Sequence, residues 1–193
     1  MDTTNTTDTR RCAWANAKNP LYTAYHDEEW GVACHDDRML FEMLILEGFQ
    51  AGLSWECVLG KREAFRAAFD AFDVETVAAY DERKLAELTA DPKIIRNRLK
   101  IGASVTNARA FIAIQEQHGS FDNYIWSFTG GKVIHEPCDQ RTTSPLSDKV
   151  AKDLKKRGMK FVGTTVIYSY LQAIGVIDGH QEGCWKHSKC KHE

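Results

Sequence analysis

The sequence lacks any apolar run of the roughly 18 to 20 residues that a helix needs to cross a bilayer. Its first ten residues, MDTTNTTDTR, are polar and acidic, so they do not resemble a secretory signal peptide. The sequence also lacks a large charge of either sign, because 25 Lys and Arg residues face 27 Asp and Glu residues. A protein with so little net charge can bind nucleic acid only through a local basic patch. We therefore expect a cytoplasmic protein with no membrane partner.

The sequence has no internal repeat, and its only low-complexity segment is the first ten residues. With 193 residues, 43% of them hydrophobic, the chain can bury a core as one domain or two small lobes. In a reducing cytoplasm, we expect the cysteines to be thiols or metal ligands rather than a disulfide framework. The six cysteines are Cys12, Cys34, Cys57, Cys138, Cys184 and Cys190.

Helical patterns occupy most of the sequence after residue 30, with apolar residues at helical spacing. The expected helices span residues 36–52, 61–72, 74–80, 82–90, a long stretch after the break at residue 92, 121–128, 147–158 and 164–175. Residues that suit their N-caps are Asp36 or Asp37, Asp73 and Asp81. One helical face is expected to carry Phe65, Phe69 and Phe72. A loop from residue 129 to about 144, with a short extended piece at 132–135, interrupts this compact all-α fold.

The segment RCAWANAKNPLYTAYHDEEW, residues 11–30, carries many rings although it has no long apolar run that would bury them. It also supplies Cys12 and His26. Near the other end, His180 and Cys184 form an H-x3-C pattern, and two thiolates with two imidazoles can hold a tetrahedral zinc ion. Spacing alone does not choose between this set and a more local group of ligand residues: Cys184, His187, Cys190 and His192.

A second polar group lies in LEGFQAGLSW. Glu47, Gln50 and Ser54 are spaced i, i+3 and i+7, so they share one helical face if the helix continues past residue 52. A solvated face is the simplest interpretation. Nearby rings favour a different one, because a carboxylate surrounded by rings suits a flat cationic base. The rings concerned are Tyr25, Trp30 and Trp55.

Several long strings of this sequence resemble one family. They are RCAW, NPLYTAYHDEEWG, LFEMLILEGFQAGLSW, KRGMKFVGTTVIYSYLQAIG and the terminal pattern D-x-H-x3-C. Together they span residues 11–184 and resemble the 3-methyladenine DNA glycosylase I family of bacterial repair enzymes, in the helix-hairpin-helix glycosylase superfamily. The resemblance implies a compact helix-hairpin-helix fold. It also implies an enzyme that flips 3-methyladenine out of alkylated double-stranded DNA and hydrolytically releases the free base.

The resemblance further implies one structural zinc that joins the N- and C-terminal segments. The matching positions are Cys12, His26, His180 and Cys184. We accordingly expect a monomer with a glycosylase domain at residues 11–184 and a disordered tail at residues 1–10. Residues 185–193 form an extension with no assigned role, and its His and Cys residues are expected to be solvated.

The chemistry of the implied substrate explains the residue types of the pocket. 3-Methyladenine in DNA is cationic, and a carboxylate about 4 Å away gains roughly 4 kcal/mol at an effective dielectric near 20. The same charge weakens the glycosidic bond, so the catalytic role of Glu47 is chiefly recognition and no general acid is needed. Base flipping costs a few kcal/mol. Stacking of the base on Tyr25 and Trp55 stabilises the flipped state by about 1 to 3 kcal/mol. Three further rings belong either to the pocket wall or to the core: Trp14, Tyr22 and Trp30.

Two basic segments are candidates for contacts with DNA phosphates, although basic helical faces are commonly just solvated. The candidate residues are Lys93, Arg96, Arg98 and Lys100 in PKIIRNRLK, and Lys155 and Lys156 in KDLKKRGMK. The first segment lies where the family places its hairpin. Here Pro92, Lys93 and Ile94 replace the Gly-x-Gly of the superfamily, which puts capture of a phosphate by backbone amides in doubt.

Two functions from other classes stay open at the level of sequence. One is a non-catalytic, zinc-clipped module that binds damaged or single-stranded DNA. The other is a protein that binds small nucleobases. Release of free 3-methyladenine from methylated duplex DNA would distinguish the enzyme from both.

Overall fold

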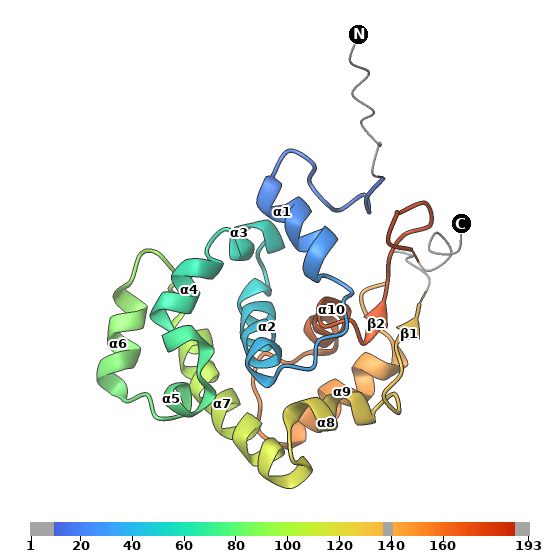
Figure 1. The fold of residues 1–193 in the computed structure, drawn as a ribbon. Coiled ribbons are helices and arrows are strands. Elements are labelled where there is room, and N and C mark those ends of the chain that lie inside the picture. Colours follow the sequence, from blue (N-terminus) through green and yellow to red (C-terminus); the bar gives the residue numbers. More distant parts are fainter. Residues whose placement is uncertain (1–9, 137–140, 188–193) are drawn as a thin grey trace.

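The computed structural model describes residues 10–136 and 141–187 (Figure 1). Most of these residues are helical, which confirms the predicted all-α class, and the only strands among them are two short ones. In chain order the elements are α1 (Pro20–Ala24), the π-helical turn η1 (Tyr25–Glu29), α2 (Asp37–Gln50), α3 (Trp55–Leu59), α4 (Arg62–Ala68), the tight turn η2 (Asp70–Phe72), α5 (Val74–Ala78), α6 (Glu82–Ala90), α7 (Arg98–His118), α8 (Phe121–Ser127), β1 (Ile134–His135), α9 (Pro145–Lys156), α10 (Thr164–Ala173) and β2 (Ile177–Asp178). Within the described ranges, none of the helices combines the length and apolar character needed to span a bilayer.

Aspartates begin three of the helices, as the sequence predicted. Asp36, Asp73 and Asp81 are the N-caps of α2, α5 and α6, and their side chains accept hydrogen bonds from first-turn amides at 2.9 to 3.0 Å. Asp37, the other candidate cap of α2, instead accepts hydrogen bonds from two backbone amides at the start of α8, at 2.9 and 2.8 Å. Its carboxylate therefore ties α2 to α8.

α2 ends earlier than the sequence predicted. Its last residue is Gln50, and Gly52 has a φ of 86°, in the left-handed region that glycine adopts without strain. Ser54 begins the next helix, because its side chain accepts a hydrogen bond at 3.2 Å from the backbone amide of Cys57 in α3. The prediction that Ser54 shares a helical face with Glu47 is therefore wrong.

The phenylalanines at 65, 69 and 72 do not share one continuous helix either. α4 ends at Ala68, and the residues of η2 have φ values between 51° and 55°. All three rings are nonetheless fully buried, and Phe69 and Phe72 stack with centroids 5.7 Å apart. The spacing predicted the core correctly but not the helix, because a tight turn can also direct successive rings to one side.

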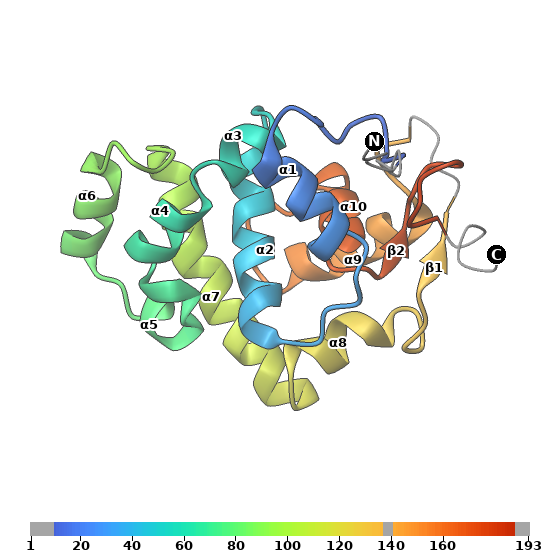
Figure 2. The same ribbon diagram turned by 45° about the horizontal axis from the view of Figure 1, so that its top comes forward.

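α2 is the central helix of the molecule, with α4–α7 on one side and α8–α10 with both strands on the other (Figures 1 and 2). Its buried residues occupy nearly the whole circumference of the helix, as expected for a helix inside a core. Residues of α2 can therefore contact both halves of the chain.

The two ends of the described chain meet beside the strands. β1 and β2 pair in parallel, with Ile134 opposite Ile177, which confirms the short extended piece predicted at residues 132–135. Beyond β2, the backbone amide of Trp185 donates a hydrogen bond to the carbonyl of Arg10 at 2.9 Å. The segment that contains His180 and Cys184 is thereby held against the segment that opens the chain.

Candidate functional site

Three of the predicted metal ligands lie together where the two ends of the chain meet. The ligand atoms of Cys12, His26 and Cys184 all lie within 4.8 Å of one another, and all three residues are buried. The Sγ atom of Cys184 is 3.5 Å from Nε2 of His26. Of the more local alternative, Cys190 and His192 lie outside the described residues. This three-residue group, called the ligand cluster below, could hold a metal ion.

His180 lies beside the ligand cluster without being one of its three members. Its ring centroid is 5.6 Å from that of His26, at an angle of 85°. Its Nδ1 is 2.6 Å from Oδ1 of Asp178, while its Nε2 is buried and has no hydrogen-bond partner among the described residues. Gly31, with a φ of 73°, makes room for this ring, because a Cβ there would be 2.5 Å from Cε1 of His180. A carboxylate on one ring nitrogen and nothing on the other is the arrangement of a metal-binding histidine.

His26 has the same kind of partner. Its Nδ1 is 2.8 Å from Oδ1 of Asp27, which leaves Nε2 directed at the cysteines. Burial opposes ionisation of Asp27, but hydrogen bonds from Arg11, His26 and Trp185 hold its pKa at about 2. Two thiol groups together with two imidazoles fixed by carboxylates fit the donor set of a tetrahedral divalent ion.

A cavity of about 180 Å³ lies next to the ligand cluster. It brings together the six residues predicted for the base pocket, adds Gln50 from the polar face of Glu47, and adds two residues from α10. The lining residues are Trp14, Tyr22, Tyr25, Trp30, Glu47, Gln50, Trp55, Ser169 and Gln172. Sequence reasoning missed Ser169 and Gln172. Their signal was present, because two polar residues at i and i+3 on a mostly apolar helix define one polar face.

The rings of the cavity continue into the ligand cluster. Trp30 packs edge-on against Trp14 and against His180, with centroid distances of 4.8 and 4.6 Å. Tyr25 packs against Trp55 at 5.3 Å. The indole Nε1 of Trp55 is buried and finds no hydrogen-bond acceptor within the described part of the chain. Trp30 therefore contacts both the wall of the cavity and the histidine beside the ligand cluster.

Glu47 is the acidic group of the cavity and is only 4% exposed. Burial raises its pKa to about 8, so the carboxyl is mostly protonated at pH 7 when the cavity is empty. The sequence suggested a permanent carboxylate, because spacing does not reveal burial. A cation in the cavity would favour the ionised form of Glu47. Burial also raises the pKa of Tyr25 well above its usual value, which keeps the phenol neutral.

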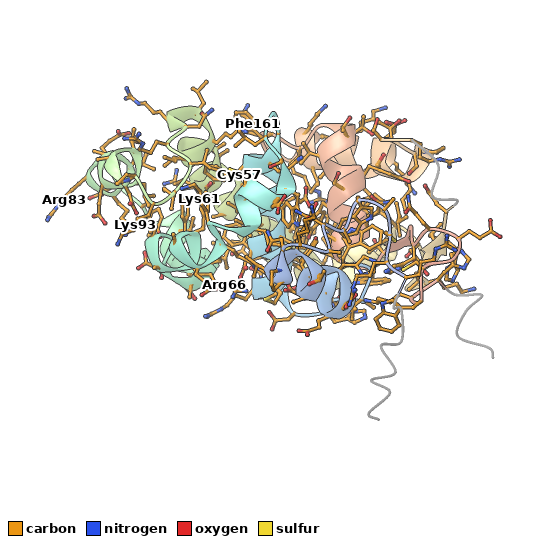
Figure 3. All side chains as sticks on the ribbon, turned by 90° about the horizontal axis from the view of Figure 1, so that it is seen from above. Cys57, Lys61, Arg66, Arg83, Lys93 and Phe161 are labelled. Carbon is orange, nitrogen blue, oxygen red and sulfur yellow. The ribbon has the colours of Figure 1, made fainter. Side chains whose placement is uncertain are left out.

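The predicted phosphate-contacting residues are mostly exposed, with one exception described next. The exposed ones are Lys93, Arg96 and Arg98 before and at the start of α7, and Lys155 and Lys156 at the end of α9. Figure 3 shows Lys93 and Lys61 near each other, and Nζ of Lys61 donates a hydrogen bond to the carbonyl of Lys93 at 2.9 Å. The amide of Lys93 donates to Oδ1 of Asp91 at 2.9 Å. That amide is therefore already used, and Pro92 before it has no N–H.

Lys100 does not belong to this exposed surface, so its prediction as a phosphate contact is corrected. Its side chain is buried, and Nζ donates hydrogen bonds to the carbonyls of Phe49 and Ala51 at 3.0 and 2.6 Å. These carbonyls lie at the C-terminal end of α2, where a helix leaves acceptors unpaired and where its dipole favours a cation. Lys100 is thus a cap for α2.

A cavity walled by rings, with one buried carboxyl group, suits a flat nitrogenous base and defines a helical protein with a base-sized pocket. The chain matches the family model described as methyladenine glycosylase over residues 14–187, and it belongs to this family. The match includes residues 185–187, which lie beyond the domain end predicted at residue 184.

Named relatives agree with this assignment. The chain is 47% identical over 182 residues to DNA-3-methyladenine glycosylase 1 of Escherichia coli (strain K12), covering 90% of this chain and 95% of the relative. Among solved structures, a crystal structure of 3-methyladenine DNA glycosylase I has a TM-score of 0.87 at 49% identity, covering 92% of this chain and all of the other. A variant of 3-methyladenine DNA glycosylase I in complex with 3-methyladenine has a TM-score of 0.86 at 35% identity, covering 90% and 95%.

Proposed function

We propose that this protein is a DNA base-excision repair glycosylase that releases 3-methyladenine from alkylated double-stranded DNA by hydrolysis. The single observation that carries the proposal is the cavity in which rings surround the buried carboxyl group of Glu47. Family membership and the names of the relatives support the choice of base. The proposed glycosylase domain comprises residues 11–184, and we expect it to act as a monomer in the cytoplasm.

Glu47 distinguishes the damaged base by its charge. The cationic base displaces the proton of Glu47 and forms an ion pair with the resulting carboxylate. Neutral adenine offers no such partner, so its entry would leave the carboxyl protonated. When the carboxylate and the cationic base are about 4 Å apart, they attract each other by roughly 4 kcal/mol at an effective dielectric near 20. Removing the proton from Glu47 offsets part of this attraction. Selectivity for the cation therefore depends on pH.

The rings hold the base after it leaves the duplex. Tyr25 and Trp55 lie at one wall of the cavity and stack on or flank the base, whereas Trp14, Tyr22 and Trp30 complete the enclosure. Base–ring stacking contributes about 1 to 3 kcal/mol per base and offsets most of the cost of flipping.

The chemical step requires little from the protein. The bond between the sugar and the cationic base breaks with both electrons passing to the base, which leaves as neutral 3-methyladenine. Water adds to the sugar carbon and loses a proton. Since the leaving group is already charged, no acid has to protonate it. Glu47 is accordingly a catalytic residue through its contact with the base.

One zinc ion, held by Cys12, His26, His180 and Cys184, is the proposed cofactor. The orphaned Nε2 of His180 and the two carboxylate-bound histidines support this set. Four protein ligands would leave such an ion no open position for water, so its contribution would be structural. Closing a loop of about 150 residues costs roughly 4 to 5 kcal/mol, whereas structural zinc sites provide about 10 to 16 kcal/mol.

We assign DNA binding to exposed Lys and Arg side chains around a hairpin. We infer that α6, the turn at residues 91–97 and α7 form the hairpin of a helix-hairpin-helix element. In this chain side chains rather than backbone amides would bind phosphates, because the amide of Lys93 is occupied. The proposed phosphate contacts are Lys93, Arg96, Arg98, Lys155 and Lys156.

The proposed function is tested by incubating the protein with methylated duplex DNA and measuring the released bases. Free 3-methyladenine should appear with time, together with an equal number of abasic sites. Tight binding to methylated DNA without any released base would instead support the non-catalytic binding module.

A further inference from the structure

A buried arginine links the two elements that bring Tyr25 and Glu47 to the cavity. Arg62, at the start of α4, is only 5% exposed. Its Nη1 donates hydrogen bonds to both carboxylate oxygens of Glu29, at 2.9 and 2.7 Å, and its Nε donates to Glu42. Glu29 is the last residue of η1, and Glu42 lies on α2. One guanidinium group therefore spans η1 and α2.

The two carboxylates are close in sequence to the polar residues of the cavity. Glu29 follows Tyr25 by four residues within η1, and Glu42 precedes Glu47 by five residues on α2. Figure 2 shows the segment that begins with α1 passing in front of α2 and α10. A shift of η1 along α2 would change the spacing between the Tyr25 ring and the Glu47 carboxyl group. The ion pairs of Arg62 oppose such a shift.

η1 has particular need of an external restraint. It is a single π-helical turn of five residues, closed by a hydrogen bond from the amide of Trp30 to the carbonyl of Tyr25 at 2.9 Å. Such turns are rare, occur often at functional sites and are too short to be stable alone. On its other side, Nζ of Lys186 donates to the carbonyls of His26 and Trp30 at 3.3 and 3.2 Å.

The ion pairs of Arg62 fix the orientation of η1 relative to α2 more than they stabilise the fold. A buried ion pair is weak evidence for stability, because removing two charges from water costs nearly as much as their attraction returns. An arginine fork bound to two carboxylates nonetheless fixes direction as well as distance. Glu42 is held a second time, because Arg66 Nε donates to both of its oxygens at 3.0 Å. Arg66 does not bridge to η1, since its other carboxylate partner is Glu63 on α4 itself.

We propose that Arg62 is a positioning residue for base recognition, which sets the spacing between Tyr25 and Glu47 by binding Glu29 and Glu42 together. The inference rests on the proposed function. It assigns the specificity of the cavity in part to residues that do not line it.

Glu29→Ala is the most direct test, because it removes the link to η1 while Arg62 keeps Glu42 as its partner. The matched control is Glu63→Ala, which removes another carboxylate from the same network on the side away from η1. For each protein, the affinity for free 3-methyladenine is measured by calorimetry. This base is neutral, so its affinity reports stacking on Tyr25 and hydrogen bonding with the carboxyl group of Glu47 rather than the ion pair. Affinity for duplex DNA with an abasic site, which places no base in the cavity, is measured in parallel.

We expect Glu29→Ala to weaken binding of free 3-methyladenine at least tenfold while abasic DNA binds within twofold of wild type. Glu63→Ala should stay within twofold in both measurements. Glu29→Gln keeps an acceptor of the same length for Arg62 and should recover most of the lost affinity. Arg62→Lys, which lacks the fork, should behave like Glu29→Ala.

Two results would overturn the positioning role. One is a Glu29→Ala protein that binds the free base as wild type does. The other is a parallel loss of base binding, abasic-DNA binding and thermal stability, which marks a merely structural contact. A wild-type protein that neither binds nor releases 3-methyladenine would refute the proposed function itself, and the inference with it.

Discussion

Replacing Glu47 by Gln should make the empty protein more stable, and increasingly so as the pH rises. In the folded protein burial raises the pKa of this carboxyl from 4.5 to about 8. Between these two values the folded state holds a proton that the unfolded state has lost. Stability therefore falls as pH rises through this window, by about 1.4 kcal/mol per pH unit. The glutamine variant keeps the shape and has no such dependence at this position.

The size of the effect follows from the same shift. From pH 4.5 to pH 7 the cost accumulates to about 3 kcal/mol, and above pH 8 it reaches a ceiling of about 5 kcal/mol. For a chain of this length, 1 kcal/mol corresponds to about 2 to 4 °C in melting temperature. Glu47→Gln should thus melt about 6 to 12 °C above wild type at pH 7 and close to wild type near pH 4.5.

Thermal and urea unfolding between pH 4.5 and 8.5, on proteins with equal metal content, would measure this difference. Glu116→Gln is a suitable control, because Glu116 is an exposed carboxyl group near the end of α7. That control should follow wild type at every pH. If the difference between Glu47→Gln and wild type does not change with pH, Glu47 is not a buried proton-binding group and the reasoning fails.

Three further predictions concern turnover, metal and DNA. The value of kcat/KM for 3-methyladenine release should rise with pH up to about 8, because Glu47 must lose its proton to pair with the cationic base, and Glu47→Gln should lower the rate and abolish this rise. Zinc content measured by atomic absorption should fall from one per chain to near zero in Cys12→Ala and in Cys184→Ala; full retention in either would favour ligands in the C-terminal tail. Removing the charges of Lys155 and Lys156 together should weaken binding to all DNA alike and reduce the slope of log K against log salt by about 2, whereas an unchanged slope would return both residues to the solvated surface.

A matched control for the salt experiment is Lys100→Met. Because Lys100 caps α2 instead of facing solvent, its loss should lower thermal stability and leave the salt slope unchanged. A reduced slope for Lys100→Met would mean that this lysine reaches DNA after all.

Local chemistry made much of the fold predictable from sequence. The aspartates at 36, 73 and 81 cap helices because a cap depends on the side chain and the next few amides. The residues at which helices end were harder to predict. The termination of α2 at Gln50 depends on the conformation of Gly52 and on the cap from Lys100, which lies 50 residues later in the chain.

The residue types of the site were predictable from sequence, but the protonation state of Glu47 was not. The rings and Glu47 were predictable because a segment with many aromatic residues but no apolar run does not look like ordinary core. The pKa of Glu47 depends on burial from every side, which no spacing reveals. Ser169 and Gln172 were missed because α10 is distant in sequence and meets the cavity only through tertiary packing. Lys186 lies in the segment for which the sequence predicts no role, yet its side chain donates hydrogen bonds to the carbonyl of His26 in η1 and to that of Trp30 directly after it.

Quantifying the bases released from methylated duplex DNA tests the central claim most directly. Wild-type protein should release free 3-methyladenine at a rate proportional to enzyme concentration, leave one abasic site for each base released and leave normal adenine in place. Methylated DNA that is bound but keeps all of its 3-methyladenine would contradict the account, because the cavity would then recognise the base without excising it.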